Sequence, residues 1–151
     1  MPQVAAVIPQ LNREGNLPVG VHVAEEKEFF DRFGAGSARR RWLGGRLREL
    51  LARAKSSGHL ERVMVWGSFV SAKESPNDVD LLLVMKPEFR LEAAPEACKV
   101  VLDYATARIS FNADVFWTKS SIGEAALRMW LDTYQTTRDF KRRGIVELKQ
   151  T

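Results

Sequence analysis

The chain has 151 residues, 45% of them hydrophobic and 28% charged, proportions that are typical of a folded globular protein and exclude general disorder. Its apolar runs fall short of the roughly 20 residues that cross a bilayer, and its start lacks a secretory pattern, so we expect a cytoplasmic protein without a membrane partner. One cysteine, Cys98, excludes an intrachain disulfide, and a net charge of +4 is compatible with a phosphate-rich partner.

The first third of the sequence predicts an arm followed by two helices. Residues 1–24 are rich in proline and glycine, which predicts an extended arm packed on a single domain that spans 1–151. A short helix is expected over 25–33, ended by a glycine. A longer helix follows, because Ser37 can cap it and leucines recur at helical spacing on one side as far as about Ser57.

The middle of the chain predicts two strands with a turn between them. The apolar segment 60–66 reads as a strand that Gly67 interrupts, and the polar stretch 73–77 is typical of a turn. The next segment, 78–85, is nearly continuously apolar after its two acidic residues. Such a run favours a central strand that is covered on both faces.

The last third of the chain predicts further alternation of helices and strands. We expect a helix over 95–107, a strand over 109–117, a helix to Tyr134 opened by a capping box at Ser121–Glu124, and a strand over 144–148. The whole therefore predicts an α/β (α+β) fold, in which a small mixed β-sheet is flanked by helices.

Three aspartates interrupt the apolar strands. Asp78 and Asp80 are separated by one residue, so on a strand both carboxylates project from the same face. Two such charges repel each other and lose hydration, and both effects cost free energy. A bound cation would compensate for this cost. Asp114 interrupts the later strand in a similar setting, and would reach the same cation if the two strands pair. The pattern predicts a site for Mg²⁺ or Mn²⁺ on three carboxylates.

The turn after the first of these strands predicts a phosphate contact. A glycine at position 67 allows backbone N–H groups to approach a phosphate closely, and the hydroxyl of Ser68 adds a donor. Lys73 lies between this turn and the aspartates, where it could also contact a phosphate. We therefore expect Gly67, Ser68 and Lys73 to bind a nucleotide.

These residues resemble the signature of the DNA polymerase beta-like nucleotidyltransferases, in which Gly-Ser, a spacer, Asp-x-Asp on a strand and a later strand aspartate follow one another. Gly67–Ser68, Asp78, Asp80 and Asp114 match these elements in order. The sequence of residues 67–73 is also similar to that of a small bacterial branch of this superfamily, which is associated with toxin–antitoxin modules. The resemblance implies the nucleotidyltransferase fold.

The function implied by this resemblance is an Mg²⁺-dependent enzyme that moves a nucleoside monophosphate from a nucleoside triphosphate such as ATP to a hydroxyl of RNA or protein. A cognate toxin or antitoxin is a further expected partner. The alternative is a catalytically silent module with the same fold that binds nucleotide, RNA or a partner protein. Retention of all three aspartates favours the enzyme.

Structural interpretations of the same residues stay open at this point. Asp78 follows a polar turn and could cap the start of its strand, and Asp114 could face water from an edge strand. The Gly67–Ser68 pair could form an ordinary tight turn. The second helix also carries a basic run that favours a solvated face over an RNA contact: Arg39, Arg40, Arg41, Arg46, Arg48, Arg53 and Lys55.

Overall fold

The computed structural model describes residues 8–137 and 141–150. Their strands are β1 Val21–Ala24, β2 Leu60–Trp66, β3 Val79–Met85, β4 Ala113–Lys119 and β5 Ile145–Leu148. Their α-helices are α1 Glu26–Phe33, α2 Ala38–Lys55, α3 Glu96–Leu102, α4 Tyr104–Phe111 and α5 Glu124–Tyr134. Short 3-10 turns are η1 Ser68–Val70, η2 Leu91–Ala93 and η3 Ser120–Ile122. None of the helices within these ranges combines the length and apolarity that a membrane crossing requires.

The strands form one mixed sheet in the order β1-β5-β2-β3-β4. The outer pairs, β1 with β5 and β3 with β4, are parallel, whereas β2 runs antiparallel to both of its neighbours. The parallel β3–β4 connection passes through α3 and α4, as a crossover between parallel strands requires. The predicted mixed sheet flanked by helices is therefore confirmed, and β3 is an internal strand.

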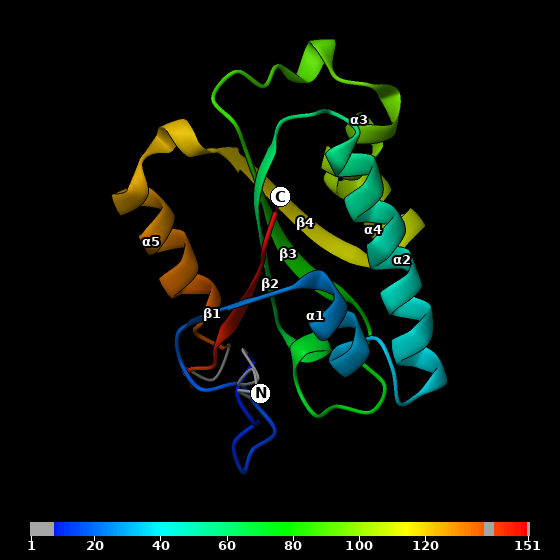
Figure 1. Ribbon diagram of the computed structural model, residues 1–151, viewed down its shortest axis with the longest axis vertical. Coiled ribbons are helices and arrows are strands. Elements are labelled where there is room, and N and C mark those ends of the chain that lie inside the picture. The colour runs from blue at the N-terminus through cyan, green and yellow to red at the C-terminus, as the bar shows by residue number, and fades with distance from the viewer. Residues whose placement is uncertain (1–7, 138–140, 151) are drawn as a thin grey trace, which may run out of the picture.

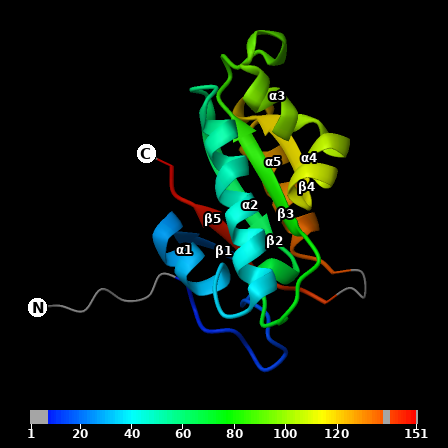
Figure 2. The same ribbon diagram turned by 90° about the vertical axis from the view of Figure 1, so that its right-hand side faces the viewer.

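Helices cover the two faces of the sheet unequally. Figures 1 and 2 show α1 to α4 on one face and α5 alone on the other. Alternate residues of β3 separate accordingly: Leu81 and Leu83 enter the larger core under α1 to α4, while Leu82 enters a smaller one with Leu127 and Leu131 of α5. Because α5 alone packs on that face, part of it stays uncovered, and Phe116 of β4 is 38% exposed there.

The segment before β1 packs against the larger core. Ile8 and Leu17 are buried there, and the guanidinium of Arg32 donates to the carbonyl of Ile8 at 2.8 Å. Residues 1–7 of the expected arm lie outside the described ranges. The last four residues of that arm, 21–24, differ from the expectation, since they pair with β5 as an edge strand.

The expectations for the early elements are confirmed, but three later ones are wrong. The helix expected over 95–107 is two helices, because Asp103 ends α3 and its side chain caps α4 at the N–H of Ala105. Residues expected to begin the next strand at 109 instead complete α4, which ends at Asn112 in a left-handed conformation. No capping box forms, since the N-cap of α5 is Gly123.

Candidate metal centre

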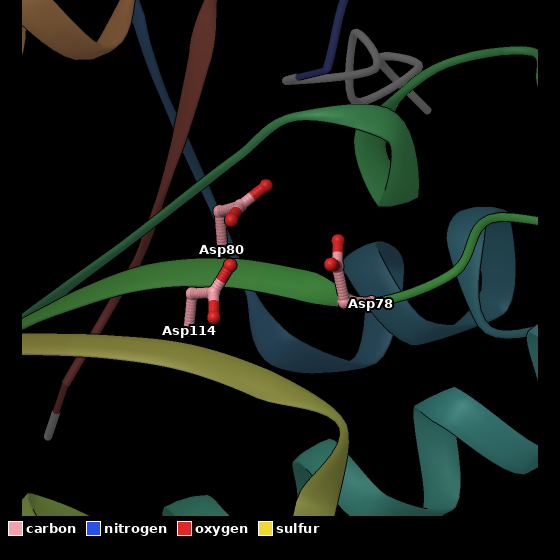
Figure 3. A group of neighbouring side chains, drawn as sticks. All are labelled: Asp78, Asp80 and Asp114. Atoms are coloured by element: carbon pink, nitrogen blue, oxygen red, sulfur yellow. The ribbon is translucent and has the colours of Figure 1, made fainter. Parts of the chain in front are cut away.

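Three aspartates lie together where β3 and β4 begin. Asp80 of β3 is the register partner of Asp114 of β4, and Asp78 immediately precedes β3. One carboxylate oxygen of each lies within 4.8 Å of the others. All three side chains lie on the same side of the sheet (Figure 3), the side that α5 covers only in part. The parallel pairing therefore brings together the three residues that the sequence singled out.

Asp80 occupies a partly buried position beside the other two carboxylates. Burial, followed by the negative charges of Asp78 and Asp114, raises the pKa of the Asp80 carboxyl to about 7. A hydrogen bond with Asp114 adds to this rise, and the positive charge of Arg143 opposes it. The site therefore destabilises the ionised form of Asp80, and a bound cation would relieve that cost.

Helix α4 supplies two side chains that contact the aspartates. One guanidinium nitrogen of Arg108 lies 2.9 Å from Asp78 Oδ2 and 2.9 Å from Asp114 Oδ1. The hydroxyl of Tyr104 donates to the same Asp114 oxygen at 3.0 Å, and this contact raises the pKa of Tyr104. These contacts orient Asp78 and Asp114, but the Arg108 charge also occupies oxygens that a metal would use.

The expected phosphate turn packs directly on Asp80. Gly67 follows β2 with φ at 86° and precedes η1, which begins at Ser68. A Cβ atom at position 67 would overlap Asp80 Oδ2, so the absence of a side chain at Gly67 is what admits the carboxylate. The first N–H groups of such a turn lack intrahelical acceptors and can bind an anion.

Replacement of Gly67 by alanine should disturb the carboxylates as well as the backbone. We expect a loss of roughly 2–3 kcal/mol of unfolding free energy and weaker Mn²⁺ binding, because a strained φ and a collision act together. Gly123→Ala is the matched control, since φ there is 95° and the space around it is open. It should cost about 1 kcal/mol and leave Mn²⁺ affinity unchanged. Equal effects of the two variants in denaturation and Mn²⁺ titration would contradict this role.

The N-terminal end of α2 holds the loop that joins Gly67–Ser68 to Asp78. The Arg40 side chain is 7% exposed and donates to five backbone carbonyls, those of Phe33, Ser68, Phe69, Ser71 and Lys73. Arg39 donates to the carbonyls of Pro76 and Asn77, immediately before the first aspartate. The expectation of a solvated basic face is thus wrong for Arg40, because the loop offers it carbonyl acceptors that replace water.

The remaining expected nucleotide contact lies in the same loop. Lys73 is exposed, and its carbonyl accepts from Arg40, while no ion pair of its ammonium occurs among the described residues. The sequence reasoning missed Tyr104, Arg108 and Arg40 as parts of this region. Arg108 could have been found from its position six residues before Asp114. It was overlooked because the predicted helix ended at 107, whereas α4 continues to Phe111.

Arg108→Gln should tighten metal binding. The guanidinium competes with a cation for Asp78 Oδ2 and Asp114 Oδ1, so removing its charge should lower the dissociation constant for Mn²⁺ severalfold. Electron paramagnetic resonance of free Mn²⁺ during titration measures this directly. Arg41→Gln, an exposed arginine of α2, serves as the control for a lost surface charge. Weaker binding by Arg108→Gln would show instead that Arg108 holds the carboxylates in place.

Comparison with known proteins gives one relationship. The profile of a family of unknown function, DUF6932, matches residues 9–149 and so includes the three aspartates, the Gly67–Ser68 turn and the arginines of α2 and α4. No match was found among curated proteins or among solved structures. Since the matched region covers nearly all of the 151 residues, the chain belongs to family DUF6932.

Proposed function

We propose that the protein is a metal-dependent nucleotidyltransferase of the DNA polymerase beta-like type, which transfers a nucleoside monophosphate from a nucleoside triphosphate to a hydroxyl of RNA or protein. The observation that carries the proposal is the grouping of Asp78, Asp80 and Asp114 within 4.8 Å, beside a glycine turn. The sequence order of turn, paired aspartates and third aspartate supports it as well.

The donor set fits Mg²⁺ or Mn²⁺. All three ligands are carboxylate oxygens, which hard divalent cations prefer, and no histidine or cysteine joins them in the described part of the chain. When bound, such cations neutralise phosphate charge and lower the pKa of an attacking hydroxyl. Asp78 and Asp80 would hold the cation that carries the triphosphate, and Asp114 would complete the site on the acceptor side.

The protein's own groups would bind and orient the reactants. The turn at Gly67–Ser68 would offer backbone N–H groups and the Ser68 hydroxyl to the phosphate oxygens of a bound nucleotide. Arg40 and Arg39 hold the two ends of the connecting loop, so this turn and Asp78 keep their relative position. Arg108 pairs with Asp78 and Asp114 in the structure, and with a cation held by these carboxylates its charge would be available to phosphate oxygens of a bound nucleotide.

Transfer can be tested with nucleoside triphosphates labelled at the α-phosphate. The protein is incubated with each triphosphate, Mg²⁺, and either cellular RNA or protein extract as acceptor. We expect covalent label on one acceptor class, lost with a chelator and in Asp114→Asn. Label transfer that is unaffected by both treatments would refute the assignment of the reaction to this site.

One observation favours a second candidate, the catalytically silent binding module. Arg108 already forms ion pairs with two of the three carboxylates, an arrangement that a non-catalytic site could retain for stability alone. In that case the protein would bind nucleotide, RNA or a partner protein such as a cognate toxin or antitoxin without product formation. Nucleotide binding that persists in Asp80→Asn, without label transfer in the wild type, would favour this candidate.

A further inference from the structure

Four aromatic side chains form a continuous cluster on the face of the sheet that carries the aspartates. Trp66 of β2 stacks on Tyr134 at the end of α5, with ring centroids 3.8 Å apart and an interplanar angle of 12°. Phe116 of β4 lies 6.2 Å from Trp66 and 5.8 Å from Tyr134, at angles of 22° and 29°. Tyr104 of α4 continues the cluster at 5.8 Å from Phe116. Three of the rings are thus close to parallel.

The cluster borders the carboxylates. Trp66 is the register partner of Asp80, and Phe116 stands two residues beyond Asp114 on the same strand face. The hydroxyl of Tyr104 donates to Asp114. Residues two apart on a strand are separated by about 6.6 Å, which is comparable with the span of a ribose between its phosphate and its base. Phe116 therefore lies about one ribose span from Asp114 along β4, while Tyr104 contacts the same aspartate directly.

The outer members of the cluster are open to solvent. Trp66 is only 8% exposed, because Leu127 and Leu131 of α5 pack over this part of the sheet. By contrast, Phe116 is 38% exposed and Tyr104 is 49% exposed. Core packing explains the positions of Trp66 and Tyr134. It does not explain why two solvent-exposed rings, Phe116 and Tyr104, continue the cluster next to three aspartates.

We propose that Phe116 and Tyr104 form the subsite for the nucleobase of the nucleotide whose phosphates lie on the metal centre. This inference rests on the proposed function and adds a substrate class to it: nucleotides recognised by stacking of the base. A planar base can continue the three nearly parallel rings by stacking on Phe116, with Tyr104 beside it inclined at 47° to Phe116. Stacking on aromatic side chains tolerates different bases. The buried Trp66 and the partly buried Tyr134 keep Phe116 in place before the base arrives.

The test compares two ligands that share phosphates but differ in the base. Binding of ATP and of inorganic tripolyphosphate, each with Mg²⁺, is measured by calorimetry on the full chain. We expect wild-type protein to bind ATP roughly fivefold to a hundredfold more tightly than tripolyphosphate. Phe116→Leu should lose most of this preference while keeping its tripolyphosphate affinity, and Phe116→Tyr should retain it. Trp42→Leu, an aromatic of α2 with 42% exposure on the other side of the sheet, should also retain it.

The possible failures are distinguishable. Equal affinity of the wild type for the two ligands would overturn the base subsite and leave the metal and phosphate site standing. Equal weakening of both ligands by Phe116→Leu would also overturn it, since Phe116 would then act only by supporting the carboxylates. Absence of binding by either ligand would refute the proposed function and this inference together.

Discussion

Asp80→Asn is expected to abolish metal-dependent transfer, by at least about a thousandfold, and yet to stabilise the metal-free protein above pH 7 by roughly 2–4 kcal/mol. The two effects have one cause. The wild-type site holds an ionised carboxylate among two others in a half-buried position, which costs folding free energy and creates metal affinity. The amide of asparagine carries no charge and can still donate to Asp114.

The pH dependence of this stabilisation follows from the sign of the shift. The folded-state pKa of Asp80 is raised to about 7 from an ordinary value of 3.8, so the folded protein holds this proton more tightly than the unfolded chain. Wild-type stability therefore falls as pH rises from about 4 to about 7, and the asparagine variant lacks this fall. The advantage of Asp80→Asn should vanish near pH 4 and reach its full size above pH 7.

Urea denaturation of both proteins at pH 4, 6 and 8, with and without Mg²⁺, measures the effect. Mg²⁺ should stabilise the wild type more at pH 8 than at pH 6, because only the ionised carboxylate is a ligand, and should leave Asp80→Asn unchanged. Asp31→Asn, which replaces an exposed acid of α1, should keep both the wild-type pH dependence and the wild-type response to Mg²⁺. A variant that is less stable than the wild type at pH 8 without metal would contradict the account.

Arg40→Met is expected to cost about 3–5 kcal/mol of unfolding free energy. The methionine fills much of the same volume, but the carbonyls of Phe69 and Ser71, which now accept at 2.7 Å and 2.6 Å, lose their donor in a buried setting. Burial lowers the pKa of Arg40, which reflects the same poorly hydrated position. Because the loop would loosen at both Ser68 and Lys73, Mn²⁺ affinity should fall as well.

Arg41→Met is the matched control for this variant, since the neighbouring arginine is exposed and its replacement should change stability by no more than about 0.5 kcal/mol. Arg40→Lys should recover only part of the loss, because one ammonium cannot reach carbonyls spread around a planar guanidinium. Chemical denaturation monitored by tryptophan fluorescence gives the three values. Equal stability of Arg40→Met and Arg41→Met would show that water can replace the guanidinium.

The elements that could be predicted have strong local signals. The leucine stripe and the Ser37 cap determine α2, and Ser37 does accept from the N–H of Arg40 at 3.1 Å. The apolar runs of β2 and β3 belong to internal strands whose residues alternate between the two cores. In each case neighbouring residues carry the information, so tertiary contacts reinforce a preference that already exists.

The region between β3 and β4 could not be predicted, because there the local preferences of the residues disagree with the structure. Ile109 and Phe111 favour a strand by residue type, yet Phe111 is buried as the last residue of α4 and Ile109 is exposed. The break between α3 and α4 depends on the side chain of Asp103, which caps α4. The end of α4 depends on Asn112, which adopts a left-handed conformation with φ at 50°. Packing of α4 against β4 and α2 decides between these preferences.

The candidate site divides in the same way. Strand alternation placed Asp78 and Asp80 on one face, but only the parallel pairing of β3 with β4 brings Asp114 to them. The contacts of Arg40 and Arg108 join elements that are distant in sequence, and a count of charges along α2 treats a buried arginine like an exposed one. The residue types of the site could therefore be read locally, whereas its supporting contacts required the fold.

The most direct test of the metal centre is anomalous scattering from a crystal soaked in Mn²⁺ and measured at the manganese edge. We predict a peak in contact with the carboxylates of Asp78, Asp80 and Asp114, with the Arg108 guanidinium moved away from them, and no such peak in Asp80→Asn. A soaked crystal with no manganese at these oxygens, and with Arg108 still bridging Asp78 and Asp114, would contradict it.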